Sequence, residues 1–318
     1  MEREMDQRPE HGTALYCLAD RCIEITPIHD YVHEYCADYR CREGCCEDGS
    51  LCCEEADSGR EKGSCCSEEQ DHAKKPYAKP DITVRITQAD IDYERVKSAR
   101  EDEEEGIPVR QFTDEYLETL AVYRKIAEVM PCFDTFLIHG SVIAADGQGY
   151  LFTAKSGTGK STHTRLWRQL LGDRAVMIND DKPLVRVVSS GEAEQSGSCC
   201  SSEGPAKFTE TGTGKDIAMI YGTPWCGKHG LNTNTSVPLK AICILERGKE
   251  NRIREITKAE AALFLLKQIY RPADPQALMK TLSLLDKLNV RFYRLACNME
   301  PEAAELAYSV MSKPEELS

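Results

Sequence analysis

The sequence lacks long apolar runs and any excess of basic residues. No stretch reaches the roughly 18 apolar residues of a membrane-spanning helix, and the charged N-terminus (MEREMDQRPEHG) lacks the apolar segment of a secretion signal. Forty Lys and Arg face 53 Asp and Glu, which gives a net charge of −13 and argues against binding to nucleic-acid backbones or anionic membranes. We therefore expect a cytoplasmic protein with no nucleic-acid partner and no membrane partner.

The chain is long enough for one large domain or two ordinary ones. Its 318 residues are 41% hydrophobic, which is enough to bury a core. Residues 1–130 are predicted to form an N-terminal α+β region. Its elements are a strand pair within 13–27, a short helix over 28–39, a strand at 82–86, a charged helix from about 89 and an amphipathic helix that carries Tyr116 and Met130.

Cysteine is abundant, with 16 residues in the chain. Two low-complexity segments, about 40–79 and about 189–213, contain vicinal cysteine pairs and little that could be buried, so we interpret them as insertion loops. Their thiolates could bind Zn²⁺ or Cu(I) or form a redox switch; the alternative is a solvent-exposed insertion without such a role. The pairs are Cys45 with Cys46, Cys52 with Cys53, Cys65 with Cys66, and Cys199 with Cys200.

Residues 131–318 are predicted to form a second domain, built around a sheet. Asp146-Gly147 between apolar runs is a type I′ hairpin signal, and Thr257 with Glu260 forms a capping box before a helix. A second helix starts at Asp274-Pro275 and a last one covers 301–311. The predicted strands are 136–145, 149–153, 175–178, 184–188, 217–221, 239–245, 252–256 and 291–295.

The segment from Tyr150 to Thr162 reads as a strand, a glycine-rich loop and the start of a helix. That order is typical of a P-loop, whose backbone N–H groups surround phosphate oxygens at a helix N-terminus. Lys160 is placed to reach the β- and γ-phosphates and the Ser161 hydroxyl to complete a Mg²⁺ shell. The alternative is an ordinary glycine-rich turn that caps a helix. The predicted nucleotide-binding residues are Ser156, Gly157, Thr158, Gly159, Lys160, Ser161 and Thr162.

Three further residues flank this motif. Asp180 and Asp181 follow the strand that ends at 178, a position that suits metal binding and general-base work. His139 stands at the end of an apolar stretch before the P-loop strand. A lone Asp-Asp is usually a turn, and a His at such a place is more often a satisfied core residue, so both readings stay open.

Together these motifs resemble the kinase domain of HPr kinase/phosphorylase, and the SGTGK string also resembles the P-loop of ATP-dependent PEP carboxykinases. The resemblance implies an α/β P-loop domain of HPr kinase/PEP carboxykinase type, with a mixed central sheet, over residues 131–318. It also implies ATP and Mg²⁺ as cofactors. In that case His139 and Lys160 contact phosphate, Ser161 and Asp181 hold the metal, and Asp180 is the catalytic base.

A long Gly/Pro/Asn segment at 222–238 separates two predicted strands. Loops of this length inside compact domains are often binding loops or lids, so Lys228 could contact the transferred phosphate and Trp225 could cover the site. The alternative is a solvent loop whose Trp225 completes the core.

Two functions of different classes follow. The first is a Mg-ATP-dependent kinase that transfers the γ-phosphate to a hydroxyl of a protein serine, a peptide or a small metabolite. The second is a nucleotide-binding regulator whose cysteine loops sense metal or redox state without productive phosphotransfer. The resemblance also leaves a homo-oligomer open.

Overall fold

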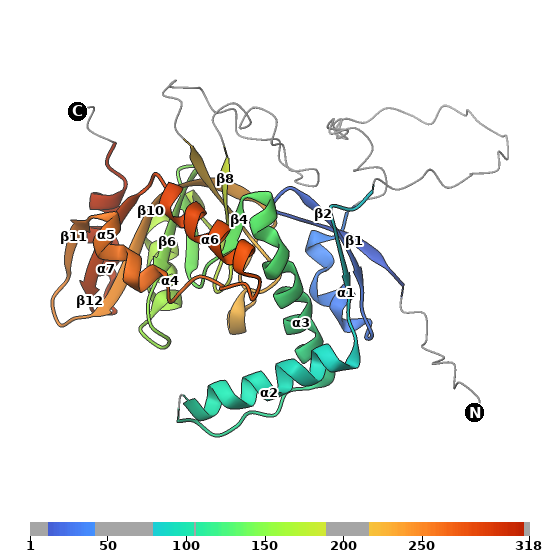
Figure 1. The fold of residues 1–318 in the computed structure, drawn as a ribbon. Helices are drawn as coiled ribbons and strands as arrows, with labels where there is room; N and C mark the ends of the chain where they lie inside the picture. The colour runs from blue at the N-terminus through green and yellow to red at the C-terminus, as the bar shows by residue number, and fades with distance from the viewer. Residues whose placement is uncertain (1–11, 42–78, 105, 189–215, 315–318) are drawn as a thin grey trace, which may run out of the picture.

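The computed structural model describes residues 12–41, 79–104, 106–188 and 216–314. It has a mixed α/β fold with two sheets and helices packed against them (Figure 1). The predicted Cys45, Cys46, Cys52, Cys53, Cys65, Cys66, Cys199 and Cys200 lie outside the described residues.

The N-terminal region contains a three-stranded sheet in the order β1-β2-β3. β1 and β2 form the predicted antiparallel pair, and β3 joins β2 in parallel. Thr113 caps the N-terminus of α3, because its side chain accepts a hydrogen bond from Tyr116 N. The elements are β1 (Ala14–Leu18), β2 (Arg21–Thr26), α1 (Tyr31–Tyr35), a 3₁₀ turn (Ala37–Tyr39), β3 (Ile82–Arg85), α2 (Gln88–Glu104) and α3 (Asp114–Val129).

The larger sheet follows the order β4-β8-β9-β10-β6-β5-β7. β10 changes neighbours along its length: residues 236–238 pair with β9 in antiparallel, and residues 241–247 pair with β12 in parallel. Its strands are β4 (Thr135–Leu137), β5 (Ser141–Ala145), β6 (Gln148–Thr153), β7 (Ala175–Asn179), β8 (Leu184–Val188), β9 (Ile217–Tyr221), β10 (Ser236–Arg247), β11 (Arg252–Ile256) and β12 (Arg291–Cys297).

Two helix layers cover opposite faces of this sheet, because alternate strand residues enter two separate cores. Val142 and Ala144 pack with α5 and α6, whereas Ile143 and Ala145 pack with α4 and α7. Trp167 of α4 is fully buried against Tyr150, which fixes that helix on the sheet. The helices are α4 (Lys160–Leu171), α5 (Lys258–Leu265), α6 (Pro275–Lys287) and α7 (Pro301–Met311).

The predicted hairpin and capping box are both present. Asp146 and Gly147 have φ values of 52° and 74° between β5 and β6, as a type I′ turn requires. Thr257 and Glu260 exchange both capping-box hydrogen bonds at the start of α5. The helix expected over 28–39 is instead the short α1 followed by a 3₁₀ turn.

The single strand predicted over 136–145 is wrong, because the structure divides it into β4 and β5. Gly140 lies between them, and a Cβ at this position would come within 2.5 Å of Leu151 Cδ1. The backbone leaves the sheet there, and His139 N donates a hydrogen bond to Gln268 O at 2.7 Å. β4 consequently pairs with β8, far across the sheet from β5.

A third core joins the N-terminal region to the larger sheet. It contains apolar residues of β1, β2, β3, α1 and α3 together with Leu184, Tyr221 and Trp225. Asp20 accepts hydrogen bonds from Arg186 at 3.0 Å and from Tyr221 at 2.6 Å across the same contact. In the part of the chain that the structure describes, none of the helices is both long and apolar enough to cross a membrane.

Candidate functional site

The glycine-rich loop lies between β6 and α4, as the sequence predicts. Gly157 and Gly159 have φ values of 70° and 119°, which L side chains rarely adopt. Lys155, Ser156 and Gly157 are exposed, and Gly159 O accepts the hydrogen bond from His163 N that opens the helix. The loop therefore presents backbone to solvent at a helix N-terminus, which is the arrangement that binds anions.

One side chain from another strand holds the loop. Arg247 at the end of β10 donates from Nη2 to Gly157 O at 2.5 Å. Because β10 runs parallel to β6, its carboxyl end reaches the same edge of the sheet as the loop. Crevices at the carboxyl ends of parallel strands are the usual ligand sites of open α/β sheets.

The two aspartates follow β7, where Asn179 shapes the turn. Its Oδ1 accepts hydrogen bonds from Asp181 N at 2.9 Å and Lys182 N at 2.7 Å. Its Nδ2 donates to Thr223 O at 2.9 Å. Asn179 is fully buried, so its hydrogen bonds are shielded from water and hold the turn from which Asp180 and Asp181 reach different partners, Ser141 and His139.

Asp180 is nearly enclosed, with 5% of its surface exposed. Its Oδ1 accepts a hydrogen bond from the Ser141 hydroxyl, and its backbone N donates to Leu231 O at 3.1 Å. The Ser141 hydroxyl in turn lies 3.3 Å from Thr164 Oγ1 on α4. A buried carboxylate needs such donors, because burial without them strongly penalises its charged form.

Asp181 is more open and lies among cations. His139 Nε2 lies 3.2 Å from its Oδ1. Burial raises the pKa of Asp181, but the His139 hydrogen bond and the charges of Lys182 and Lys160 outweigh it, so the pKa is lowered overall. The side chain therefore stays ionised to lower pH than an ordinary aspartate.

The charges of both carboxylates act on Lys160. Its burial lowers its pKa, and the charges of Asp181 and Asp180 partly offset that effect. The first turn of α4 and the aspartate pair therefore lie within electrostatic reach of each other. The structure thus brings together residues from three separate segments of the sequence: His139, Lys160, and the adjacent Asp180 and Asp181.

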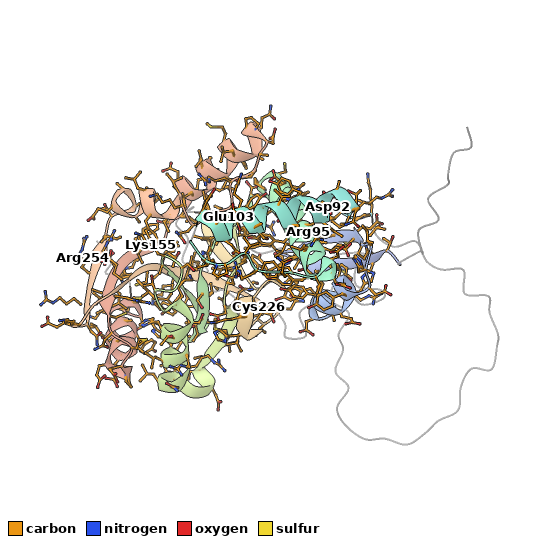
Figure 2. All side chains as sticks on the ribbon, turned by 90° about the horizontal axis from the view of Figure 1, so that it is seen from below. Asp92, Arg95, Glu103, Lys155, Cys226 and Arg254 are labelled. Atoms are coloured by element: carbon orange, nitrogen blue, oxygen red, sulfur yellow. The ribbon has the colours of Figure 1, made fainter. Side chains whose placement is uncertain are left out.

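The segment 222–238 passes beside the aspartates. A Cβ on Gly227 would lie 3.2 Å from Asp181 Cβ, and Lys228 next to it is exposed. Burial raises the pKa of the neighbouring Cys226 thiol, and the charges of Asp180 and Asp181 raise it further. Figure 2 labels Cys226 in this segment and Lys155 in the P-loop.

Trp225 is placed in the core of the N-terminal region. Its side chain is 3% exposed, and its Nε1 donates to Thr119 O at 2.9 Å. The ring also packs against Tyr123, with 5.2 Å between centroids. This placement agrees with the core-packing alternative and differs from a side chain that covers the site.

Four residues of this site have no place in the motifs read from the sequence: Ser141, Thr164, Asn179 and Arg247. The sequence gives only a weak indication of Ser141 and Thr164, because each is a small polar residue among apolar residues that are buried. Asn179 directly precedes the aspartates, where Asn commonly forms a turn with its own backbone. Arg247 has no local signal, because its role depends on β10 lying beside β6.

Comparisons with known proteins add little to this description. No family model matches the chain, and no curated protein matches it. Among solved structures, the chain is similar to a structure titled the Hpr(Ser) kinase/phosphatase from Coxiella burnetii, with 12% identity and a TM-score of 0.25. That match covers 55% of this chain and 93% of the other.

Proposed function

We propose that the protein is a Mg-ATP-dependent kinase that transfers the γ-phosphate of ATP to a hydroxyl group. The observation that carries this proposal is the meeting of the P-loop helix with two aspartates. Lys160 lies within electrostatic reach of Asp180 and Asp181, and the latter is bonded to His139. Phosphoryl transfer needs a cation that stabilises the transferred phosphate and carboxylates that bind the metal and take up a proton, and these groups lie at the proposed phosphate-binding loop.

The residues present fit a magnesium ion. Within the described ranges, no three His, Cys, Asp or Glu side chains form a metal cluster. Mg²⁺ does not need one, because it usually keeps several waters and binds through one or two carboxylates plus substrate phosphates. In the proposal Asp181 and the Ser161 hydroxyl hold the ion, which neutralises charge on the phosphates when it is bound.

The protein groups then divide the reaction between them. Backbone N–H groups of residues 156–162 orient the phosphates, and Lys160 stabilises the charge that develops on the transferred group. Asp180 takes the proton of the acceptor hydroxyl while the oxygen of that hydroxyl bonds to the γ-phosphorus. The bond between the γ-phosphorus and the oxygen that bridges it to the β-phosphate breaks, and ADP leaves. His139 contacts phosphate and keeps Asp181 oriented.

The finer assignments belong to the same proposal. They comprise a P-loop domain of HPr kinase/PEP carboxykinase type over residues 131–318, preceded by an α+β region over 1–130. They also comprise a cytoplasmic location and an acceptor that is a protein, a peptide or a small metabolite, with Lys228 near the transferred phosphate. The support is the order of strand, P-loop, helix and aspartate-bearing strand on one sheet.

Phosphate transfer tests the proposal directly. The native protein and Asp180→Asn are incubated with γ-labelled ATP, Mg²⁺ and a fractionated cell extract, and label is followed into protein and small-molecule fractions. A kinase gives label that depends on Asp180 while the variant still binds ATP. ATP binding without Asp180-dependent label would contradict the proposal and favour a nucleotide-binding regulator.

A further inference from the structure

Two buried hydroxyls connect the aspartate pair to the P-loop helix. Ser141 is fully buried at the start of β5, and Thr164 is 2% exposed on α4. β5 and β7 pair in antiparallel with Val142 opposite Asn179, so the register brings Ser141 to Asp180 at the end of β7. Neither hydroxyl belongs to the P-loop or to the aspartate pair itself.

The contacts form a continuous chain. Ser141 donates its only hydroxyl proton to Asp180 Oδ1. Its oxygen is thereby left to accept, and Thr164 Oγ1 lies 3.3 Å away. Thr164 has one hydroxyl proton, so when it donates to Ser141 Oγ it does not donate to Lys160 O or Ser161 O, which lie 3.4 and 3.3 Å away. The link from Thr164 to the first turn of α4 is then the backbone of the helix itself. The chain thus joins Asp180 to the two residues that carry the phosphate and metal contacts of the proposed kinase.

We propose that Ser141 and Thr164 are positioning residues that set the separation between the first turn of α4 and the Asp180–Asp181 pair. This inference rests on the proposed function. Outer partners of metal-binding and catalytic groups orient those groups, and their loss typically costs about 10- to 100-fold in metal affinity or activity. Because the hydroxyl pair contacts both Asp180 and α4, it would keep the base at a fixed distance from the residues that bind phosphate and metal.

A purely structural role makes a different prediction, and the chain offers a matched control. Thr281 on α6 is also a buried helical threonine, and its hydroxyl donates to the carbonyl four residues earlier, at 2.9 Å to Ala277 O. Thr164→Val and Thr281→Val therefore remove the same group from the same kind of helical environment. Only the first variant breaks a connection to Asp180.

The test measures three quantities on the full chain: kcat, KM for ATP, and the gain in ATP affinity on adding Mg²⁺, the last by calorimetry. Ser141→Ala and Thr164→Val should lower kcat about tenfold to hundredfold. The same variants should reduce the Mg²⁺-dependent gain and leave metal-free ATP affinity and KM close to native. Thr164→Ser should restore both readouts, and Thr281→Val should change neither.

Each outcome has one meaning. If Thr164→Val behaves like Thr281→Val in kcat and in the Mg²⁺-dependent gain, the positioning role is wrong. If the native protein binds ATP but transfers no phosphate, the kinase fails, and the calorimetry still decides the positioning role. If Ser141→Ala does not fold, as seen in its circular dichroism, the decision passes to Thr164→Val and its Thr164→Ser rescue.

Discussion

The two halves of the candidate site are built in opposite ways. On the side of the glycine-rich loop, Lys155 to Gly157 are exposed, and Gly157 and Gly159 have positive φ values that other residues rarely adopt. On the aspartate side, Asn179 and Asp180 are buried, and their polar groups are bonded to neighbouring strands and loops. A phosphate can be gripped by exposed backbone, whereas a base or a metal ligand needs a carboxylate held in one direction.

The largest expected effect is on ATP affinity, from a substitution of Lys160 at the end of the glycine-rich loop. Lys160→Ala removes a cation that the charges of both aspartates reach, and in the proposed kinase it also removes two charge-assisted hydrogen bonds to phosphate. We expect ATP affinity to fall roughly 1,000-fold, about 4 kcal/mol, because each such bond contributes about 1.5–3 kcal/mol. Calorimetric titration with ATP measures it. Lys280→Ala, which breaks a surface pair with Asp134, is the control and should bind normally.

The next effect concerns His163, a buried residue of α4. Burial lowers the pKa of His163 to about 4, and its Nε2 accepts a hydrogen bond from Trp167 Nε1. In the unfolded chain the His163 imidazole therefore takes up a proton near pH 6.5, whereas in the folded protein it does so only near pH 4. As the pH falls through this window, we expect the free energy of unfolding to drop by about 3 kcal/mol on account of this residue.

Urea unfolding at pH 7.5 and pH 4.5 checks this expectation. His163→Gln should lose less stability between the two pH values than the native protein does, because the variant has no imidazole to protonate. His229→Gln, at an exposed position, should keep the native slope. A native slope in His163→Gln would show that other groups cause the pH dependence.

On the aspartate side, Asn179→Ala should cost about 2 kcal/mol of unfolding free energy. The change leaves the N–H groups of Asp181 and Lys182 without their acceptor, while the Thr223 carbonyl loses one donor and keeps Asn232 Nδ2. Asn234→Ala removes a single exposed bond to Asp38 O and should cost much less. Equal losses in thermal unfolding would mean that the turn is not held as tightly as described.

The smallest expected effect is that of Arg247→Gln. The variant loses a bond to Gly157 O but leaves every residue of the P-loop in place. We expect ATP to bind about fivefold more weakly, near 1 kcal/mol. Arg254→Gln, which affects only a surface pair with Glu260, should bind as the native protein does. A loss as large as that of Lys160→Ala would show that Arg247 touches the nucleotide itself.

Local signals in the sequence predict most elements and half of the candidate site. The turn at Asp146-Gly147 and the capping box at Thr257 depend only on neighbouring residues, so both are found without the fold. The break at Gly140 is missed, although His139, Gly140 and Ser141 interrupt the apolar pattern, because β4 and β5 separate through their pairing with different strands. The contacts of Ser141 and Arg247 likewise arise from strand pairing, which periodicity does not reveal.

The contact between Asp20 and Tyr221 has a consequence for folding during synthesis on the ribosome. These residues are 201 positions apart, and the N-terminal core also needs Leu184 and Trp225. At about 5–20 residues per second, a ribosome takes about 10 to 40 s to make the intervening chain. Through that interval α1 and α3 are already available to pack on the N-terminal strands, but the part of the core that Leu184, Tyr221 and Trp225 complete stays open, so we expect nascent chains to expose apolar surface until translation passes Trp225.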